Sequence, residues 1–402
     1  MAPEQDGFQR ELGRYGEQGA VPALICICGM HGNEPAGVFA AQRVLAELNR
    51  RNPPFQGSLI ALAGNRAALA RRCRFLAEDF NRMWFPERLA RLHSVATQCS
   101  LNPEELQCRE LSERIETLLA QHRGPVVFLD LHTTSADGVP FAIVSDTLIN
   151  RALAMSIGAP VILGLEEQLE GTLLNYINDR GLPAVGFEGG QNEASSSVEH
   201  NEAALWAILV AAGCLRDGVV ERAVNLRNLL QQRSASIPGI LEVRYRHAIT
   251  RTAQFVMEPG FVNFQPIKRG QLLARDRHGD ILARENGRIL LPLYQRQGSD
   301  GFFMVREISR GWLRLSALAR RMRLERLLRF VPGIERSPQG PDTLVVNPRV
   351  ARWLAVDLLH LLGFRRRRSE CGKIVVSRRP HDMSSLTEWS STPDNNEPRS
   401  VL

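Results

Sequence analysis

The chain has 402 residues, of which 44% are hydrophobic and 23% charged, and its formal net charge is +7. These values are ordinary for a globular protein and leave room for one large domain with one or two smaller ones. No run approaches the roughly 18 consecutive apolar residues of a membrane span, and residues 1–15 lack the apolar core of a secretory signal. The seven cysteines show no disulfide-like spacing, which fits a reducing compartment. We therefore expect a cytoplasmic protein.

The first half of the chain alternates apolar runs with amphipathic stretches. Short buried strands are predicted at 21–28, 58–63, 125–131, 140–145, 160–163 and 183–187. Apolar residues at helical spacing predict helices at 38–50, 101–122 and 197–214. This order predicts an α/β fold of three layers, with a parallel or mixed sheet between two helical layers. Reactive groups of such folds gather at the carboxyl ends of the strands, so the search for a site begins there.

Two histidines stand at predicted strand ends. His31 and Glu34 lie in the Gly-rich run 27–37, which follows the first strand and opens a helix, and His132 ends the strand 125–131. If these strands are neighbours, the three side chains meet at one edge of the sheet. A catalytic zinc site needs three such ligands and one open position for water. Asp130 is interpreted equally well as an acceptor that orients the His132 imidazole and as a cap of the following loop.

Two other segments carry groups that could act on a substrate. In the run 74–84, Arg74 could stabilise an oxyanion beside zinc, and the pair Asn81–Arg82 could grip a carboxylate. Glu188 ends an apolar strand and precedes two glycines, so a partly desolvated carboxylate there could move a proton between water and a leaving amine. Taken singly, the arginines also fit a surface role and Glu188 fits a turn cap.

Four runs together resemble the succinylglutamate desuccinylase/aspartoacylase family, relatives of the zinc carboxypeptidases: G-M-H-G-N-E-P-A-G, R-F-L-A-E-D-F-N-R-M, D-L-H-T-T and F-E-G-G, in that order. The resemblance extends over residues 20–310. The resemblance implies a zinc-carboxypeptidase-like domain with one Zn²⁺ per chain, and it implies that the zinc ligands are His31, Glu34 and His132. It also implies catalytic roles for Glu188, as general base and then acid, and for Arg74, as support of the oxyanion. The site for the substrate carboxylate would be formed by Asn81 and Arg82. In some members a tyrosine of the β domain reaches the substrate, and Tyr294 is a candidate for it, although its loop context equally suits a packed aromatic residue.

The predicted secondary structure changes after residue 233, where short strands replace the alternation of strands and helices. Short strands are predicted at 243–251, 260–263, 271–275, 281–283 and 288–293, which indicates a small all-β domain, a sandwich or barrel. Residues 312–379 hold sixteen Lys or Arg against five Asp or Glu, with helical patterns at 313–330 and 345–364. The predicted units are a catalytic domain (18–233), a β domain (234–311), a basic and partly helical extension (312–380) and a disordered tail (381–402).

The leading hypothesis is a zinc-dependent hydrolase that releases a carboxylate and an amine from an N-acyl amino acid. A carboxypeptidase or amidase that uses the same groups on a small peptide is the first alternative. A metal-binding scaffold whose basic C-terminus recruits a partner is the second. The sequence leaves open a homo-oligomer and an acidic partner for the basic extension, and the abundance of arginine over lysine gives no reason to expect nucleic-acid binding.

Overall fold

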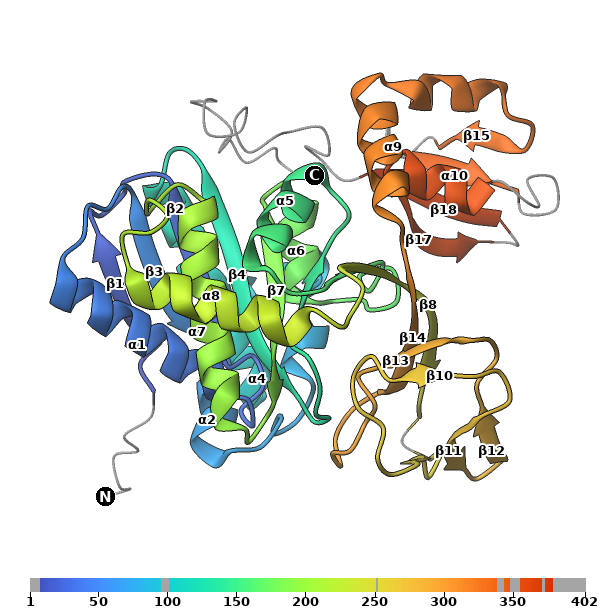
Figure 1. Ribbon diagram of the computed structural model, residues 1–402, viewed down its shortest axis with the longest axis horizontal. Coiled ribbons are helices and arrows are strands. Elements are labelled where there is room, and N and C mark those ends of the chain that lie inside the picture. Colours follow the sequence, from blue (N-terminus) through green and yellow to red (C-terminus); the bar gives the residue numbers. More distant parts are fainter. Residues whose placement is uncertain are drawn as a thin grey trace.

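The computed structural model describes residues 8–94, 101–250, 252–337, 343–347, 355–370 and 373–378. Its centre is an eleven-stranded mixed sheet with the strand order β1-β3-β2-β4-β7-β5-β6-β8-β14-β13-β10 (Figure 1). The strands of its first half are β1 (Glu11–Gly16), β2 (Ala23–Cys28), β3 (Ser58–Ala63), β4 (Val126–Thr134), β5 (Phe141–Val144), β6 (Val161–Leu163) and β7 (Ala184–Gln191). The accompanying helices are α1 (Ala36–Arg51), α2 (Arg66–Arg71), η1 (Phe80–Arg82), α3 (Pro86–Ser94), α4 (Pro103–Gln121), α5 (Leu148–Ile157), α6 (Leu173–Asp179), α7 (Ser195–Ala211) and α8 (Glu221–Ser234).

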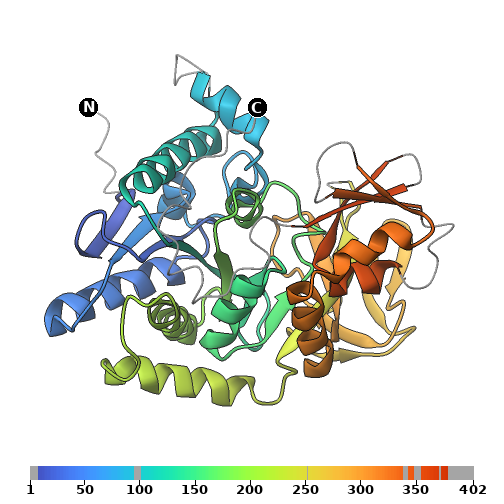
Figure 2. The same ribbon diagram turned by 90° about the horizontal axis from the view of Figure 1, so that it is seen from above.

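The three layers follow from side chains that alternate between the faces of fully buried strands. In β2, Leu24 and Cys28 pack in the core formed with α1, α5, α7 and α8, whereas Ile25 and Ile27 pack in the core formed with α3, α4 and α6. Figure 2 shows these two helical layers on either side of the sheet. The predicted three-layer α/β arrangement with a mixed sheet is therefore present.

Strand pairing brings the predicted strand ends together. β2 and β4 are parallel neighbours with Cys28 opposite Leu131, and β4 and β7 are parallel neighbours with His132 opposite Glu188. His31 follows β2 by three residues, so the carboxyl ends of three adjacent strands deliver chemistry-bearing residues to one edge. This is the edge at which open α/β sheets bind ligands.

The β-rich region continues the central sheet instead of standing apart from it. β8 (Ile240–Ala248) pairs in parallel with β6, and β14 (Asp300–Glu307), β13 (Gly287–Leu290) and β10 (Pro266–Ile267) follow. A second, three-stranded sheet contains β9 (Val256–Met257), β11 (Leu272–Asp276) and β12 (Gly279–Leu282). The strand expected at 260–263 does not form, and Asn263 instead makes a single bridge to Gly138, in the first half of the chain.

The basic extension is not simply helical. It contains α9 (Arg310–Arg321), η3 (Leu324–Phe330), β15 (Ile334–Arg336), β16 (Thr343–Val346), α10 (Ala355–Leu361), β17 (Phe364–Glu370) and β18 (Lys373–Arg378). Its four strands form an antiparallel sheet in the order β15-β16-β18-β17 around a small core of its own. The predicted disordered tail, 381–402, lies outside the described residues.

The cysteines of the described segments are all free thiols, and Cys26 and Cys28 are fully buried in β2, where they pack in the hydrophobic core. No helix in the described part of the chain is both long enough and apolar enough to span a bilayer.

Candidate active site

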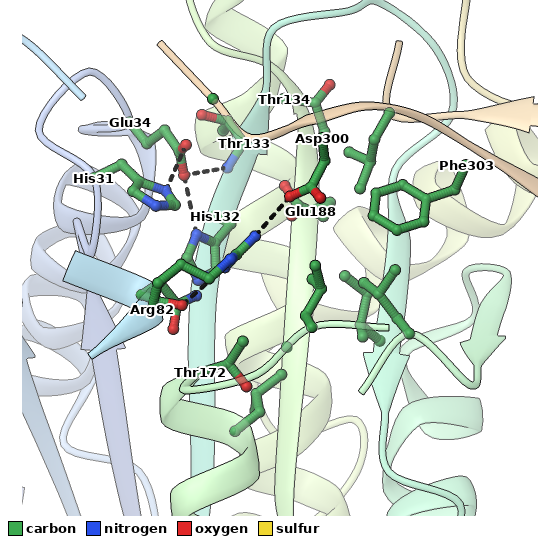
Figure 3. Close-up of a pocket in the computed structure, with 18 of the residues that line it drawn as sticks. His31, Glu34, Arg82, His132, Thr133, Thr134, Thr172, Glu188, Asp300 and Phe303 are labelled. Atoms are coloured by element: carbon green, nitrogen blue, oxygen red, sulfur yellow. Dashed lines mark hydrogen bonds and ion pairs between the residues drawn. The ribbon is translucent and has the colours of Figure 1, made fainter. Parts of the chain in front are cut away.

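His31, Glu34 and His132 form a buried cluster. One ligand atom of each lies within 4.8 Å of those of the other two. The Nδ1 atom of His31 lies 2.9 Å from one oxygen of Glu34, and Nδ1 of His132 lies 3.0 Å from the other oxygen (Figure 3). All three side chains are less than a tenth exposed. Two imidazole nitrogens and a carboxylate that converge in this way are a suitable donor set for a divalent metal ion.

A tight turn places two of these residues side by side. The Glu34 amide donates to the His31 carbonyl at 3.2 Å, so the two side chains project from the same side of the loop. The loop lies against α2 so closely that a Cβ on Gly32 would come within 2.0 Å of the Ala68 backbone. Gly29 has φ +68°, a conformation that favours glycine. The Gly-rich composition of the run is thus a requirement of this close approach.

A carboxylate stands behind each imidazole. Nε2 of His31 is 3.1 Å from Asp79, and Nε2 of His132 is 2.9 Å from Asp130. Asp130 and His132 are two residues apart on β4 and therefore share a face of the strand. Such partners fix the orientation of a metal-binding imidazole and leave its other nitrogen directed at the ion.

The ionisation of the two central carboxyls differs. Burial opposes ionisation of Glu34, but the imidazoles of His31 and His132 outweigh it, so the pKa of Glu34 lies well below its usual range. Burial raises the pKa of Glu188 to about 8; Glu34 and Asp130 add to the rise, whereas His132 and Arg74 oppose it. The Oε2 atom of Glu188 is buried and has no hydrogen-bond partner in the described structure. A carboxyl of this kind can exchange protons near neutral pH.

Arg74 is tied to the same cluster. Its guanidinium donates to Glu34 at 3.3 Å and to Asp79 at 3.2 Å, and burial, which would lower its pKa, is outweighed by these carboxylates. The loop that carries it is anchored by Glu104 of α4, a fully buried residue whose carboxylate accepts hydrogen bonds from the amides of Leu76 and Ala77 at 2.7 and 2.9 Å. A cation therefore stands next to the candidate metal site in a fixed position.

Arg82 and Asn81 make contacts within the protein. Nη2 of Arg82 is 2.9 Å from Asp300, the first residue of β14, and Nη1 donates to the Asn81 carbonyl at 2.8 Å. The side-chain oxygen of Asn81 accepts from the Leu173 amide at 2.9 Å. Nε of Arg82 is buried and has no partner among the described residues. Arg82 thus links the first half of the chain to the β-rich region and keeps one donor for a ligand.

Seven of the eight residues singled out in the sequence line a single cavity of about 140 Å³. These residues are His31, Glu34, Arg74, Asn81, Arg82, His132 and Glu188. Tyr294 is not among the described lining residues, although its neighbours Leu293 and Gln295 are. Its hydroxyl donates to the Glu258 carbonyl and accepts from the Phe261 amide, both at 2.8 Å. In this structure Tyr294 therefore braces its own loop.

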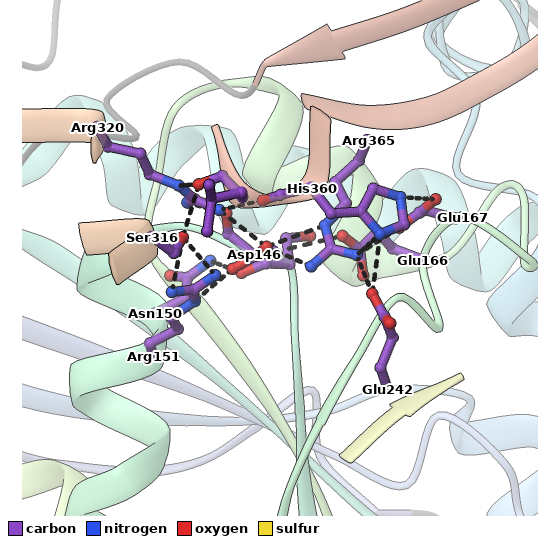
Figure 4. A network of polar contacts seen from close by, with 12 residues as sticks. Asp146, Asn150, Arg151, Glu166, Glu167, Glu242, Ser316, Arg320, His360 and Arg365 are labelled. Atoms are coloured by element: carbon purple, nitrogen blue, oxygen red, sulfur yellow. Dashed lines mark hydrogen bonds and ion pairs between the residues drawn. The ribbon is translucent and has the colours of Figure 1, made fainter. Parts of the chain in front are cut away.

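The far wall of the cavity is held by an ion-pair network that reaches the C-terminal region. Asp146 follows the lining residue Ser145, and its buried carboxylate contacts Arg151, Arg320 and Arg365 (Figure 4). Arg365 also lies 2.9 Å from Glu242 and 3.0 Å from Glu167. Two of the arginines that make the extension basic therefore find their acidic partners inside this chain.

Sequence reasoning missed Asp79, Glu104, Asp146 and Asp300. Asp79 lies within the quoted run R-F-L-A-E-D-F-N-R-M, so its position between Arg74 and Asn81 was a usable signal. Glu104 lies in an ordinary helical pattern, and Asp300 meets Arg82 across 218 residues of sequence. No local pattern marks contacts of that kind.

Comparison with known proteins agrees with the geometry. Residues 20–208 match the family model of the succinylglutamate desuccinylase/aspartoacylase catalytic domain. The fold is similar to a succinylglutamate desuccinylase/aspartoacylase from Rhodobacter sphaeroides, with TM-score 0.51, 19% identity, and coverage of 73% of this chain and 87% of that one. It is also similar to the product-bound ectoine utilization protein from Ruegeria pomeroyi (TM-score 0.52, 19% identity, 73% and 87% covered). A succinylglutamate desuccinylase from Vibrio cholerae gives TM-score 0.50 at 16% identity, with 71% and 82% covered.

These structural likenesses establish the shared fold, and the family model covers the segment that supplies every residue of the His–Glu–His cluster as well as Arg74 and Glu188. The comparisons thus place a match to the succinylglutamate desuccinylase/aspartoacylase catalytic domain at residues 20–208 of this chain.

Proposed function

We propose that this protein is a zinc-dependent hydrolase that cleaves the amide bond of an N-acyl amino acid. The observation that carries the proposal is the buried cluster of His31, Glu34 and His132 beside Glu188, whose Oε2 atom has no hydrogen-bond partner among the described residues. Two imidazoles and one carboxylate match the ligand set of catalytic zinc sites, which keep a further position open. The carboxylates of Asp79 and Asp130 behind the imidazoles suit the same ion.

His31, Glu34 and His132 would hold the zinc ion, which would polarise the amide carbonyl and lower the pKa of a water molecule. Glu188 lies in the cavity beside these ligands, so its carboxylate can take the proton of the attacking water and deliver it to the departing nitrogen. Arg74 supplies a fixed positive charge where negative charge develops on the carbonyl oxygen. The free Nε of Arg82, together with the side-chain amide of Asn81, would hold the carboxylate of the amino acid.

The experiment combines metal analysis with turnover of a panel of N-acyl amino acids under chelation and zinc add-back. Glu188→Gln keeps the shape of the side chain and should retain zinc while losing about 10²–10⁴-fold in kcat, the usual contribution of a general acid–base. Glu193→Gln changes an exposed carboxylate of the following turn and serves as the matched control. Equal turnover by Glu188→Gln and the wild type would remove Glu188 from the mechanism.

His132→Ala should abolish both zinc retention and turnover. A protein that binds no metal when supplied with zinc would refute the proposal. A short dipeptide in the same panel separates the deacylase from a peptidase, because the peptidase alternative predicts that the dipeptide is cleaved fastest.

A further inference from the structure

We propose that the cavity accepts an amide whose acyl group is apolar and uncharged, and that it disfavours an acyl group with a second carboxylate. The inference rests on the proposed amide hydrolysis and names the substrate class of the same site. It follows from two independent features of the cavity, an extended apolar wall and the commitment of its cations to internal partners.

The apolar wall lies beyond the metal-binding cluster. It is formed by apolar side chains from both halves of the molecule, among them Ile143, Leu165, Leu169, Leu174, Leu293 and Phe303. In Figure 3, Phe303 lies on the far side of Glu188 and Arg82 from His31 and Glu34. Apolar groups gain free energy when they leave water for such a wall, whereas a charged group loses hydration there without compensation.

The cations of the cavity are already paired. Among the described lining residues the permanent cations are Arg74 and Arg82. Arg74 donates to Glu34 and Asp79, and Arg82 contacts Asp300 at 2.9 Å. Arg246 holds the other oxygen of Asp300 at 2.6 Å, which keeps this carboxylate in place.

The lining also contains acids that would repel a second carboxylate. Asp300 and Glu166 line the cavity, so an acyl group ending in a carboxylate would approach like charges while giving up its hydration. The Nε atoms of Arg74 and Arg82 are both buried without a partner among the described residues. In the proposed function Arg74 serves the carbonyl oxygen and Arg82 serves the carboxylate of the amino acid, so the described lining has no further permanent cation for a second carboxylate. The remaining part of the substrate must therefore be neutral.

All of these side chains except Leu293 also belong to a hydrophobic core between the two halves of the sheet. If they had only that packing role, the protein would not distinguish a neutral acyl group from a charged one of the same shape. The decisive comparison is therefore between two isosteric substrates.

The test uses the zinc-loaded full chain with the N-succinyl and N-(4-methylpentanoyl) derivatives of one amino acid. The two acyl groups have the same length and branching, and an isopropyl group replaces the terminal carboxylate in the second. We expect kcat/KM to be at least tenfold higher for the 4-methylpentanoyl substrate. Equal or faster cleavage of the succinyl substrate would overturn this inference and leave the proposed function standing, whereas failure to cleave any amide would overturn both.

A charge-adding variant supplies a second readout. Leu293 is a partly exposed wall residue, so Leu293→Arg places a cation at the wall with little loss of core packing. It should raise the succinyl-to-methylpentanoyl ratio of kcat/KM at least tenfold. Leu282→Arg, at an exposed position of β12 outside the described lining, is the control and should leave the ratio unchanged. An unchanged ratio in Leu293→Arg would overturn the assignment of this wall to the acyl group.

Discussion

Replacement of Asp146 by Asn is expected to destabilise the protein far more than the loss of one surface ion pair. The Asp146 carboxylate is fully buried and contacts Arg151, Arg320 and Arg365. Burial opposes its ionisation, but the three guanidiniums outweigh it and hold the pKa well below the usual range. Asparagine preserves the shape and leaves three buried cations without their shared anion. Breaking a buried ion pair on one side costs about 3–5 kcal/mol.

The loss can be measured as the midpoint of urea unfolding. The slope of the unfolding free energy is about 1–3 kcal/mol per molar urea for small proteins and is steeper for longer chains, so the midpoint of this 402-residue chain should fall by about 0.5–1 M. Asp217→Asn is the matched control, since Asp217 is 57% exposed and pairs with Arg227 at the surface. Such a pair contributes about 0–1 kcal/mol. If the two variants shifted the midpoint equally, the conclusion that Asp146 joins the C-terminal region to the catalytic half would be refuted.

Three other outcomes follow from contacts described above. Asp130→Asn should weaken zinc binding about 10–100-fold by releasing the His132 imidazole, and isothermal titration with zinc would detect this; an unchanged affinity would contradict the orienting role. Glu104→Gln removes the charge that anchors the Arg74 loop and should lower kcat while the zinc content stays at the wild-type level. An unchanged kcat would contradict this anchoring role. Burial opposes ionisation of Glu242, but His360 and Arg365 outweigh it and lower its pKa from 4.5 to about 2. Its stabilising effect is therefore complete above pH 4.5 and disappears as the pH falls towards 2, so Glu242→Gln should lose less stability over that acid range than the wild type.

The fold of the first half of the chain was predictable because its signals are local. Fully buried parallel strands appear in the sequence as short apolar runs, and all six runs predicted in the first half form strands. The rule that reactive groups follow strand ends then selects His31, His132 and Glu188. Their roles as ligands and proton carrier stay predictions.

The C-terminal sheet escaped detection for a physical reason. β17 carries four consecutive arginines, Arg365 to Arg368, and so lacks the alternation of apolar and polar residues that marks a half-buried strand. Arg365 is buried by ion pairs with Asp146, Glu167 and Glu242 and not by apolar packing. A local pattern cannot reveal a residue that is buried by partners more than a hundred positions away.

The continuous sheet has a consequence for how a substrate enters. β6 and β8 are joined by a parallel hydrogen-bonded ladder from Val161 opposite Ile240 to Leu163 opposite Glu242. Swinging the two halves apart would expose these backbone groups without partners, which is costly in a buried strand pair. The cavity between them therefore has a fixed width, and its lining joins the His31–Glu34–His132 cluster to the loop that carries Leu293 and Gln295. Selectivity between substrates therefore depends on the residues that line a preformed cavity and its entrance. It does not depend on a closure of the two halves after the substrate has bound.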